Sequence, residues 1–311
     1  MEKVIVICGP TASGKTALSI ELAKQINGEI ISADSMQIYK DMNIGTAKPT
    51  QEEMQGIKHY LLDFISPDKR YSVAEYKKDA KKAIKEIISK GKTPIIVGGT
   101  GLYVDSLIYE IEYQDIKLDE EYRNELEKIA NKDGLEKLYE MAEKIDREAM
   151  TKISKKDKKR IMRVLEIYKA TGKTKTQQEA ESRKKPVEYD YKVFAINWER
   201  GKLYERINLR VDIMIEQGLI QEVNDILQKY DKFPTAMQGL GYKEVVDYLN
   251  GKYTKQEMID KIKMETRRYA KRQLTWFRKN KQTVWLDGSK DRQNNINIIL
   301  EGINWKKKQR K

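Results

Sequence analysis

The sequence of 311 residues contains a single cysteine, Cys8, and a single histidine, His59. One cysteine cannot form an intramolecular disulfide, and its isolation excludes a metal–thiolate cluster. No window approaches eighteen uncharged apolar residues, which argues against a transmembrane helix. Residues 1–3 run directly into a strand-like segment and lack the apolar region of a signal peptide. From these absences we expect a cytoplasmic protein with no part inserted in a membrane.

Acidic residues are scarce in three segments that carry most of the positive charge. The net charge is +13, and residues 152–185 hold 13 Lys/Arg against 4 Asp/Glu. Residues 261–281 hold 9 Lys/Arg against 1 Asp/Glu, and residues 306–311 add 5 more positive charges. Because clustered positive charge attracts a phosphate backbone, this pattern favours a nucleic-acid partner. A solvated lysine-rich surface is the alternative interpretation.

Short apolar runs rich in β-branched residues alternate with segments of helical periodicity. This alternation predicts a parallel α/β sheet with right-handed crossovers, flanked by helices in the manner of P-loop NTPases. Ser72, with Glu75 three residues later, forms a capping-box pattern at the start of one helix. The predicted strands are residues 3–8, 29–32, 93–97, 193–198 and 283–286, and the predicted helices include 16–26 and 72–90.

Residues 113–186 interrupt this alternation. They are highly charged and have the pattern of successive helices, at roughly 119–132, 134–145 and 157–171. We interpret them as an inserted all-helical subdomain, acidic in its first half and basic in its second. Residues 1–112 and 187–311 then form the α/β core with its C-terminal helices.

The turn after the first predicted strand fits the P-loop pattern G-x-x-x-x-G-K-[ST]. In such a loop, backbone N–H groups surround a phosphate and the following helix N-terminus adds positive potential. Lys15 supplies a point charge and Thr16 a Mg²⁺ ligand, so Mg²⁺ is the expected cofactor. The pattern is shared by ATP- and other nucleotide-binding proteins and specifies a di- or triphosphate, but not ATP itself. The predicted phosphate-binding residues are Gly9, Pro10, Thr11, Ala12, Ser13, Gly14, Lys15 and Thr16.

The sequence lacks the second apolar strand ending in aspartate that ATPases and GTPases use to hold Mg²⁺. The best candidate, residues 93–97, is followed by Gly98, and the only strand-terminal carboxylate is Asp34. Because the carboxyl ends of parallel strands form the ligand crevice, we expect Asp34 and Thr100 to face the P-loop. Asp34 could hold a metal ion, as in a small-molecule kinase, or act as a general base.

Several longer motifs resemble those of the tRNA dimethylallyltransferases and occur in the same order from residue 3 to about 287. The resemblance implies transfer of a dimethylallyl group from dimethylallyl diphosphate to N6 of adenosine 37. That adenosine lies beside the anticodon of tRNAs that read codons beginning with U. Apart from the P-loop, the matching segments are 32–49, 98–103, 159–166, 206–210, 239–242 and 266–273.

The chemistry that this resemblance implies fits the residues. An exocyclic adenine amine is a poor nucleophile because its lone pair is delocalised into the ring, so a carboxylate that accepts its proton is useful. We expect the adenine to be flipped out of the anticodon loop to reach such a base. By resemblance, Asp34, Thr100 and Arg210 are catalytic, with Arg210 closing on the diphosphate. The tRNA-binding residues that it implies are Asp34, Ser35, Met36, Gln37, Thr100, Arg123, Lys159, Arg160, Ile161, Met162 and Arg163.

Two other classes of protein share part of this pattern. A small-molecule kinase would have the P-loop and a lone carboxylate, but it would not need basic clusters or a basic insertion. A non-enzymatic nucleic-acid-binding module could keep a degenerate P-loop, but Gly14, Lys15 and Thr16 are intact. His59 is expected to be structural rather than catalytic, and we expect a monomer.

Overall fold

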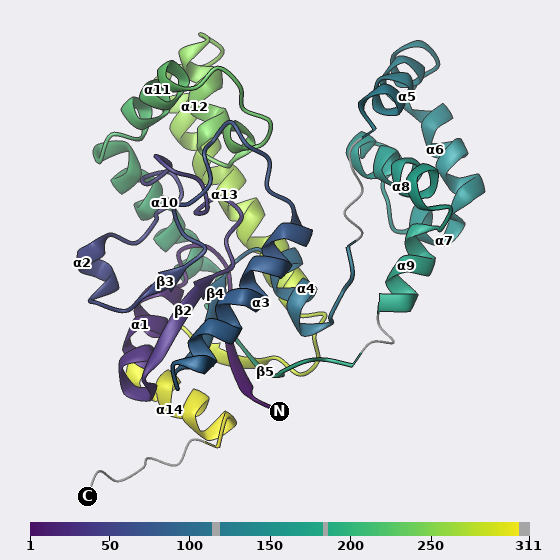
Figure 1. The fold of residues 1–311 in the computed structure, drawn as a ribbon. Coiled ribbons are helices and arrows are strands. Elements are labelled where there is room, and N and C mark those ends of the chain that lie inside the picture. Colours follow the sequence, from purple (N-terminus) through teal and green to yellow (C-terminus); the bar gives the residue numbers. More distant parts are fainter. Residues whose placement is uncertain (114–118, 183–185, 305–311) are drawn as a thin grey trace, which may run out of the picture. The chain divides into compact units, whose positions relative to one another are not determined.

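The computed structural model describes residues 1–113, 119–182 and 186–304, and the chain divides into two compact units. The first unit consists of residues 1–105 and 188–311, and the second of residues 106–187 (Figure 1). The basic segment 306–311 noted in the sequence lies outside the described residues. In the described ranges, no helix is long and apolar enough to cross a membrane.

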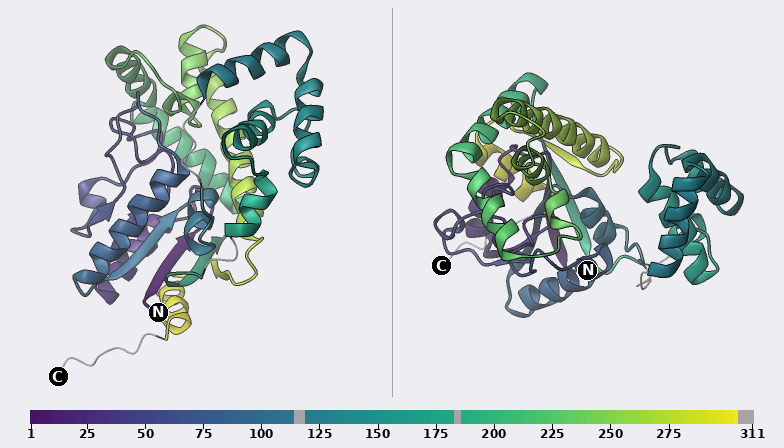
Figure 2. Two further views of the ribbon diagram at one scale, coloured as in Figure 1. Left: turned by 45° about the vertical axis from the view of Figure 1, so that its right-hand side comes forward. Right: turned by 90° about the horizontal axis from the view of Figure 1, so that it is seen from above.

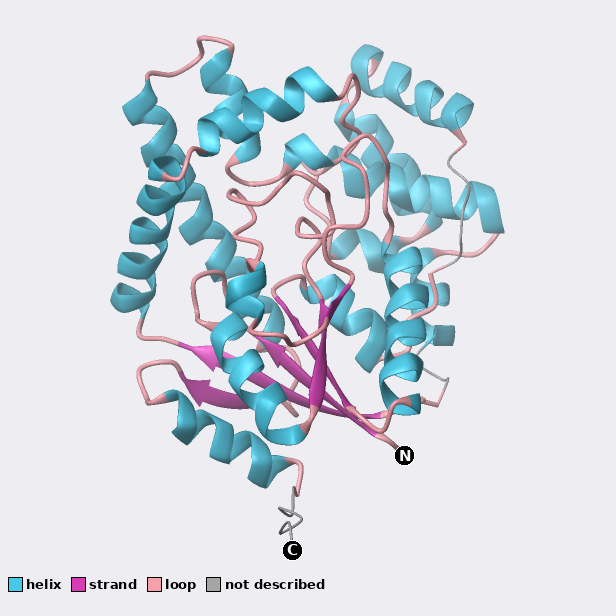
Figure 3. Ribbon diagram, turned by 60° about the vertical axis from the view of Figure 1, so that its left-hand side comes forward, coloured by secondary structure: helices cyan, strands magenta, loops and turns pink. Residues whose placement is uncertain are grey.

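A six-stranded parallel sheet forms the centre of the first unit, with strand order β3-β2-β4-β1-β5-β6. The predicted parallel α/β fold is therefore confirmed; the two-residue strand β3 was not predicted. All six strands point the same way, so the loops that follow them gather at one edge of the sheet (Figure 3). The strands are β1 (Lys3–Cys8), β2 (Gly28–Ser32), β3 (His59–Tyr60), β4 (Thr93–Gly98), β5 (Asp190–Asn197) and β6 (Val284–Asp287).

Helices cover both faces of this sheet because alternate residues of each strand point to opposite sides. Ile5 and Ile7 of β1 pack in one buried cluster with α1 (Lys15–Ile26) and α14 (Arg292–Gly302). The opposite face is covered by α3 (Val73–Ser89), which contacts β2 and β4. Ser72 and Glu75 form the predicted capping box at the start of α3. The short helix α2 (Gln51–Met54) precedes β3, and α4 (Gly101–Ile108) follows β4.

The helices between β5 and β6 form a second apolar cluster with the segment that follows β2. Ile38, Tyr39 and Met42 of that segment are buried against these helices. The apolar contacts therefore hold the loop after β2 to the C-terminal half of the chain, 150 or more residues away in sequence. The elements are α10 (Arg200–Glu216), α11 (Leu219–Lys229), the 3₁₀ turn η1 (Ala236–Gln238), α12 (Tyr242–Leu249) and α13 (Lys255–Phe277).

The second unit consists of helices around their own apolar core, and both views in Figure 2 show these teal helices gathered in one bundle. Three of them confirm the predicted helical segments, namely α5 (Glu120–Lys132), α6 (Leu135–Ile145) and α8 (Lys158–Thr171). Two shorter helices, α7 (Arg147–Thr151) and α9 (Lys175–Ser182), were not predicted.

A buried polar contact joins α4 to α13 in the first unit. The Trp276 indole N–H donates to Oδ2 of Asp105 at 2.8 Å. Burial raises the pKa of Asp105 to about 6, although the bond from Trp276 and the charge of Lys279 act in the opposite direction. The ionised carboxylate is thus less favourable in the folded protein than in the unfolded chain. The contribution of Asp105 to stability is therefore fully present below its unfolded pKa and is lost as the pH rises through about 6.

We predict that Asp105→Asn is more stable than the wild type, by a margin that grows with pH. Asparagine keeps an oxygen for Trp276 but carries no charge, so the margin should widen by about 1 kcal/mol between pH 5 and pH 8. Urea unfolding followed by tryptophan fluorescence measures this, because all four tryptophans lie outside residues 106–187. A margin that is the same at both pH values would contradict the assigned pKa.

Candidate active site

The P-loop connects β1 to α1 at the carboxyl edge of the sheet. Ala12 and Gly14 both have positive φ angles, 61° and 91°, which turn the backbone around the loop. Gly14 caps α1, and its position has no side-chain hydrogen bond. The first N–H groups of a helix have no partner within the helix, so this end of α1 can bind an anion. The Ser13 hydroxyl is buried and has no hydrogen-bond partner among the described residues.

Two cations, Lys15 and Arg210, lie close together at this loop. The Lys15 ammonium donates to the carbonyl oxygens of Gly9 at 2.9 Å and Pro10 at 2.7 Å. Burial and the neighbouring charge of Arg210 lower the pKa of Lys15 to about 8, while Asp34 acts to raise it. Burial also lowers the pKa of Arg210, and here too Asp34 acts in the opposite direction. The site therefore holds positive charge that a bound anion would stabilise.

Asp34 and Thr100 lie side by side, as expected from the direction of their strands. Oδ1 of Asp34 accepts hydrogen bonds from the backbone N–H groups of Met36 at 2.8 Å and Gln37 at 3.3 Å. Oγ1 of Thr100 accepts from the backbone N–H of Ser35 at 3.0 Å. One oxygen of Asp34 therefore shapes its own turn, and Thr100 holds that turn to the loop after β4.

The Gln37 side chain is fixed by the loop that follows it. Its amide donates to the carbonyl oxygens of Thr46 at 3.1 Å and Ala47 at 3.2 Å. Glu222 of α11 holds this loop in turn, because its carboxylate accepts hydrogen bonds from three consecutive backbone N–H groups and from the Tyr242 hydroxyl. The role of Glu222 is not predicted by the sequence. Only its position within an acidic turn of an amphipathic helix could have pointed to it.

Two further side chains contact the P-loop, and both belong to segments that match the family's motifs. Arg206 of α10 donates from Nε to the Ala12 carbonyl at 2.8 Å, and its guanidinium lies 4.4 Å from the ring centroid of Trp198. Gln273 of α13 accepts a hydrogen bond from the backbone N–H of Thr11 at 2.9 Å. No local pattern predicts these contacts, since they join residues separated by 194 and 262 positions.

The tRNA-binding residues expected at 123 and 159–163 all lie in the second unit, where they differ in exposure. Lys159 and Arg160 are exposed, and Arg160 pairs with Asp157 at 3.3 Å. Ile161 and Met162 are buried in the helical core, at 0% and 1% exposure, so a contact of these two residues with tRNA would be made by their backbone. Exposure differs along the run 159–163 because successive residues of a helix point in different directions.

Arg123 and Arg163 of this unit share a buried carboxylate. Glu166 is only 7% exposed, and its two oxygens lie 3.1 Å from Nη1 of Arg123 and 3.5 Å from Nη1 of Arg163. Both arginines are half-buried, so Glu166 fixes their orientation and offsets part of their charge.

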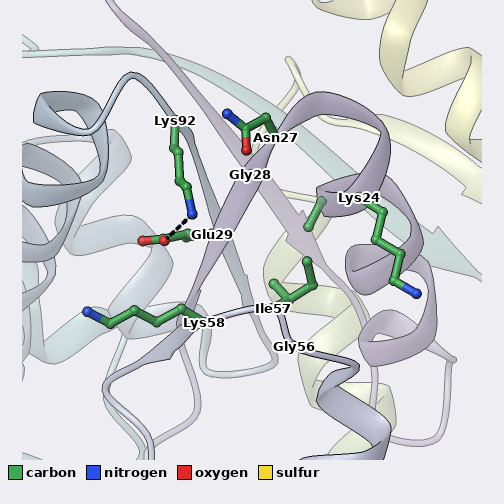
Figure 4. Close-up of a pocket in the computed structure, with 9 residues that line it drawn as sticks. Lys24, Asn27, Gly28, Glu29, Gly56, Ile57, Lys58 and Lys92 are labelled. Carbon is green, nitrogen blue, oxygen red and sulfur yellow. Dashed lines mark hydrogen bonds and ion pairs between the residues drawn. The ribbon is translucent and has the colours of Figure 1, made fainter.

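A pocket of about 460 Å³ lies at the opposite edge of the sheet from the P-loop (Figure 4). Gly28 and Lys92 in its wall stand at the amino ends of β2 and β4. The ammonium of Lys92 pairs with Glu29 at 2.7 Å, so the charges in this pocket already have partners. We do not assign a ligand to it. Its lining residues are Ala23, Lys24, Asn27, Gly28, Glu29, Gly56, Ile57, Lys58 and Lys92.

His59 lies in the edge strand β3, and its Nδ1 is 2.9 Å from the Ile57 carbonyl oxygen. Burial lowers the pKa of this histidine, so it is neutral near pH 7. No group of three or more His, Cys, Asp or Glu side chains in the described ranges could hold a metal ion. The first unit is thus a P-loop α/β protein whose site gathers cations and one carboxylate at the carboxyl edge of its sheet.

Comparisons with known proteins agree with this description. The family described as IPP transferase matches residues 37–280. The chain is 52% identical to a tRNA dimethylallyltransferase of Acetivibrio thermocellus over 92% of each chain. It is 50% identical to the tRNA dimethylallyltransferase of Carboxydothermus hydrogenoformans, over 97% of this chain and 98% of the other.

Solved structures give the same result. The tRNA isopentenylpyrophosphate transferase of Bacillus halodurans is 43% identical, with a TM-score of 0.73 over 98% of this chain and 96% of the other. A eukaryotic dimethylallyltransferase acting on tRNA is 30% identical, with a TM-score of 0.84 over 100% of this chain and 82% of the other. The fold and these likenesses define a prenyltransferase of the P-loop type. The chain belongs to the IPP transferase family, that of the tRNA dimethylallyltransferases, which confirms the predicted family and class of enzyme.

Proposed function

We propose that this protein transfers the dimethylallyl group of dimethylallyl diphosphate to N6 of adenosine 37 in tRNAs that read codons beginning with U. The bond that breaks joins C1 of the dimethylallyl group to the diphosphate oxygen, and the bond that forms joins C1 to N6. The amine proton passes to a carboxylate, and diphosphate leaves. The observation that carries the proposal is that Asp34, held in its own turn against Thr100, interacts electrostatically with both Lys15 of the P-loop and Arg210.

The P-loop is proposed to hold the diphosphate through its backbone amides, the unpartnered Ser13 hydroxyl and the two cations. Charge grows on the diphosphate as the C–O bond breaks, so donors already in place stabilise the transition state more than the ground state. Lys15 and Arg210 suit this role because their repulsion is relieved most when the negative charge between them is greatest. Arg206 extends the positive surface along the same helix.

Asp34 is proposed as the general base for the adenine amine. Its Oδ1 is used by the Met36 and Gln37 backbone, and the same carboxylate can accept the proton as the C–N bond forms. Thr100 and Ser35 border the same position and can contact the flipped base. Met36 and Gln37 are proposed to contact the base and its neighbours, and the fixed amide of Gln37 suits that task.

The second unit is proposed to bind the anticodon stem through its cationic surface. The cationic side chains proposed for this role are Lys159, Arg160, Arg163 and Arg123, and the buried Ile161 and Met162 would contribute through their backbone. Contacts to phosphates give affinity and register without reading the sequence. The proposal places the enzyme in the cytoplasm with its tRNA substrate. A monomer suffices, since all residues assigned a role belong to one chain.

Mg²⁺ is the proposed cofactor, and the residues present fit an ion that is held partly by the substrate. The Thr16 hydroxyl is exposed at the start of α1, and the described residues contain no all-protein carboxylate cage. Mg²⁺ commonly keeps several waters and binds through substrate phosphates, so Thr16 and the diphosphate would hold it together. When bound, the ion would neutralise charge on the leaving diphosphate.

The proposal is tested by incubating the protein with dimethylallyl diphosphate, radiolabelled in the dimethylallyl group, and unmodified tRNA. Label is expected in tRNA with the wild type, and Asp34→Asn should lower turnover by about 10²–10⁴-fold. Asparagine keeps the oxygen that the Met36 and Gln37 amides need, so folding and tRNA affinity should not change. Asp225→Asn, an exposed change in the same unit, serves as the control.

Two outcomes would count against this assignment. No label in tRNA, together with ATP turnover on a small acceptor, would identify a kinase instead. Full turnover in Asp34→Asn would show that Asp34 is not the general base and only stabilises its own turn.

Neutralising Lys159, Arg160 and Arg163 together should flatten the salt dependence of tRNA binding. The slope of log K against log salt should fall by about 1 for each phosphate contact that is lost. The matched control replaces Lys155, Lys173 and Lys175 by glutamine, since each of these pairs with a glutamate in the same unit. An equal fall of the slope in both triple variants would show that overall positive charge, rather than a specific binding site, attracts the tRNA.

A further inference from the structure

One face of α13 contacts the P-loop, the loop after β4 and helix α4 at the carboxyl edge of the sheet. Tyr269, Gln273 and Trp276 are spaced four and three residues apart, which places them on the same side of a helix. Tyr269 lies against Thr100, and Trp276 bonds to Asp105 of α4. Gln273 lies between these two and reaches the P-loop. The segment 266–273 therefore lies against the loops of the active site, a placement that its sequence pattern does not predict.

The Gln273 amide joins the loop after β1 to the loop after β4. Its Oε1 accepts from the backbone N–H of Thr11 at 2.9 Å, and its Nε2 donates to the carbonyl oxygen of Gly99 at 2.9 Å. The side chain is only 6% exposed, so water competes little for either bond. A planar amide that presents an acceptor and a donor in opposite directions is suited to this bridge.

The fit between α13 and the loop after β4 is close. A Cβ atom added to Gly99 would lie 2.2 Å from Nε2 of Gln273. One added to Gly101 would lie 2.4 Å from the ring of Trp276. A side chain at either position would displace the side chain of Gln273 or Trp276, so the loop lies against the helix at two neighbouring points.

The bridge connects the two halves of the proposed reaction. Thr11 belongs to the loop that holds the leaving diphosphate. Gly99 precedes Thr100, which holds the Ser35 backbone beside Asp34. The only side chain that bonds directly to both loops, within the described part of the chain, is that of Gln273.

We propose that Gln273 is a positioning residue that fixes the distance between the leaving diphosphate and the adenine amine. This inference rests on the proposed function, because it concerns the geometry of that transfer. The attacking nitrogen, C1 and the departing oxygen must be aligned, and a shift of about 1 Å at such a centre can cost about 10²-fold in rate. Gln273 acts through Thr11 and Gly99, so it should affect the chemical step more than the binding of either substrate.

The test uses Gln273→Glu, because the protonation state of the glutamate decides whether the hydrogen bond to the Gly99 carbonyl can form. The ionised side chain keeps an oxygen for the Thr11 N–H but turns a second, negative oxygen toward the Gly99 carbonyl. The protonated side chain has an O–H donor in that place and resembles glutamine. Gln256→Glu, at the exposed start of the same helix, is the matched control.

Single-turnover rates are measured with saturating dimethylallyl diphosphate and tRNA between pH 5.5 and pH 8. Gln273→Glu is expected to be about 10²-fold slower than the wild type at pH 8 and within about tenfold at pH 5.5. The KM values should change less than about threefold, and Gln256→Glu should match the wild type throughout. Dividing by the wild-type rate removes any pH dependence that both proteins share.

A loss that does not depend on pH, or one confined to KM, would overturn the proposal. If Gln273→Glu does not fold at pH 8, Gln273→Met carries no charge and should show the rate loss at every pH. A wild-type rate in Gln273→Met would overturn the proposal equally. A wild type that transfers no dimethylallyl group defeats the proposed function instead, whereas an active wild type with an equally active variant defeats only the bridge.

Discussion

The site depends on two cations that the fold holds together in partly buried positions. Lys15 and Arg210 repel each other, and among the ion pairs formed by the described residues none involves either of them. Burying unpaired charge lowers stability, and the negative charge of Asp34 offsets part of this penalty. An anionic ligand between the cations relieves the repulsion. The proposed diphosphate carries the negative charge that would offset both cations.

The rest of the first unit can be understood as the scaffold for this arrangement. The parallel sheet brings Lys15, Asp34 and Thr100 to one edge, and α10 brings Arg210 to the same place. The parts are held by backbone-directed contacts from distant helices rather than by the loops themselves. Glu222 secures the loop after β2, and Gln273 joins the other two. Such supports explain how loops can hold a reacting pair at a fixed distance.

The sequence predicts the features that depend on neighbouring residues. The P-loop, the capping box at Ser72 and the helices of the second unit follow from local patterns, and all three are found. The proximity of Asp34 and Thr100 follows from one topological rule, that parallel strands end at the same edge. These predictions need no knowledge of how distant helices pack.

The sequence could not supply contacts made across the fold. Gln273 and Thr11 are 262 residues apart, and Glu222 holds the loop after β2 through that loop's backbone N–H groups. No pattern of residue types encodes either contact. The burial of Ile161 and Met162, by contrast, follows from helical periodicity alone.

The central claim is that the P-loop holds a leaving group and does not present a phosphoryl group for transfer. It is tested most directly with dimethylallyl diphosphate carrying ¹⁸O in the oxygen that bridges C1 and phosphorus. Prenyl transfer breaks the C–O bond, so all of the ¹⁸O should appear in the released diphosphate, in a one-to-one ratio with prenylated tRNA. Recovery of the label in dimethylallyl alcohol or dimethylallyl monophosphate would show cleavage at phosphorus and contradict the account.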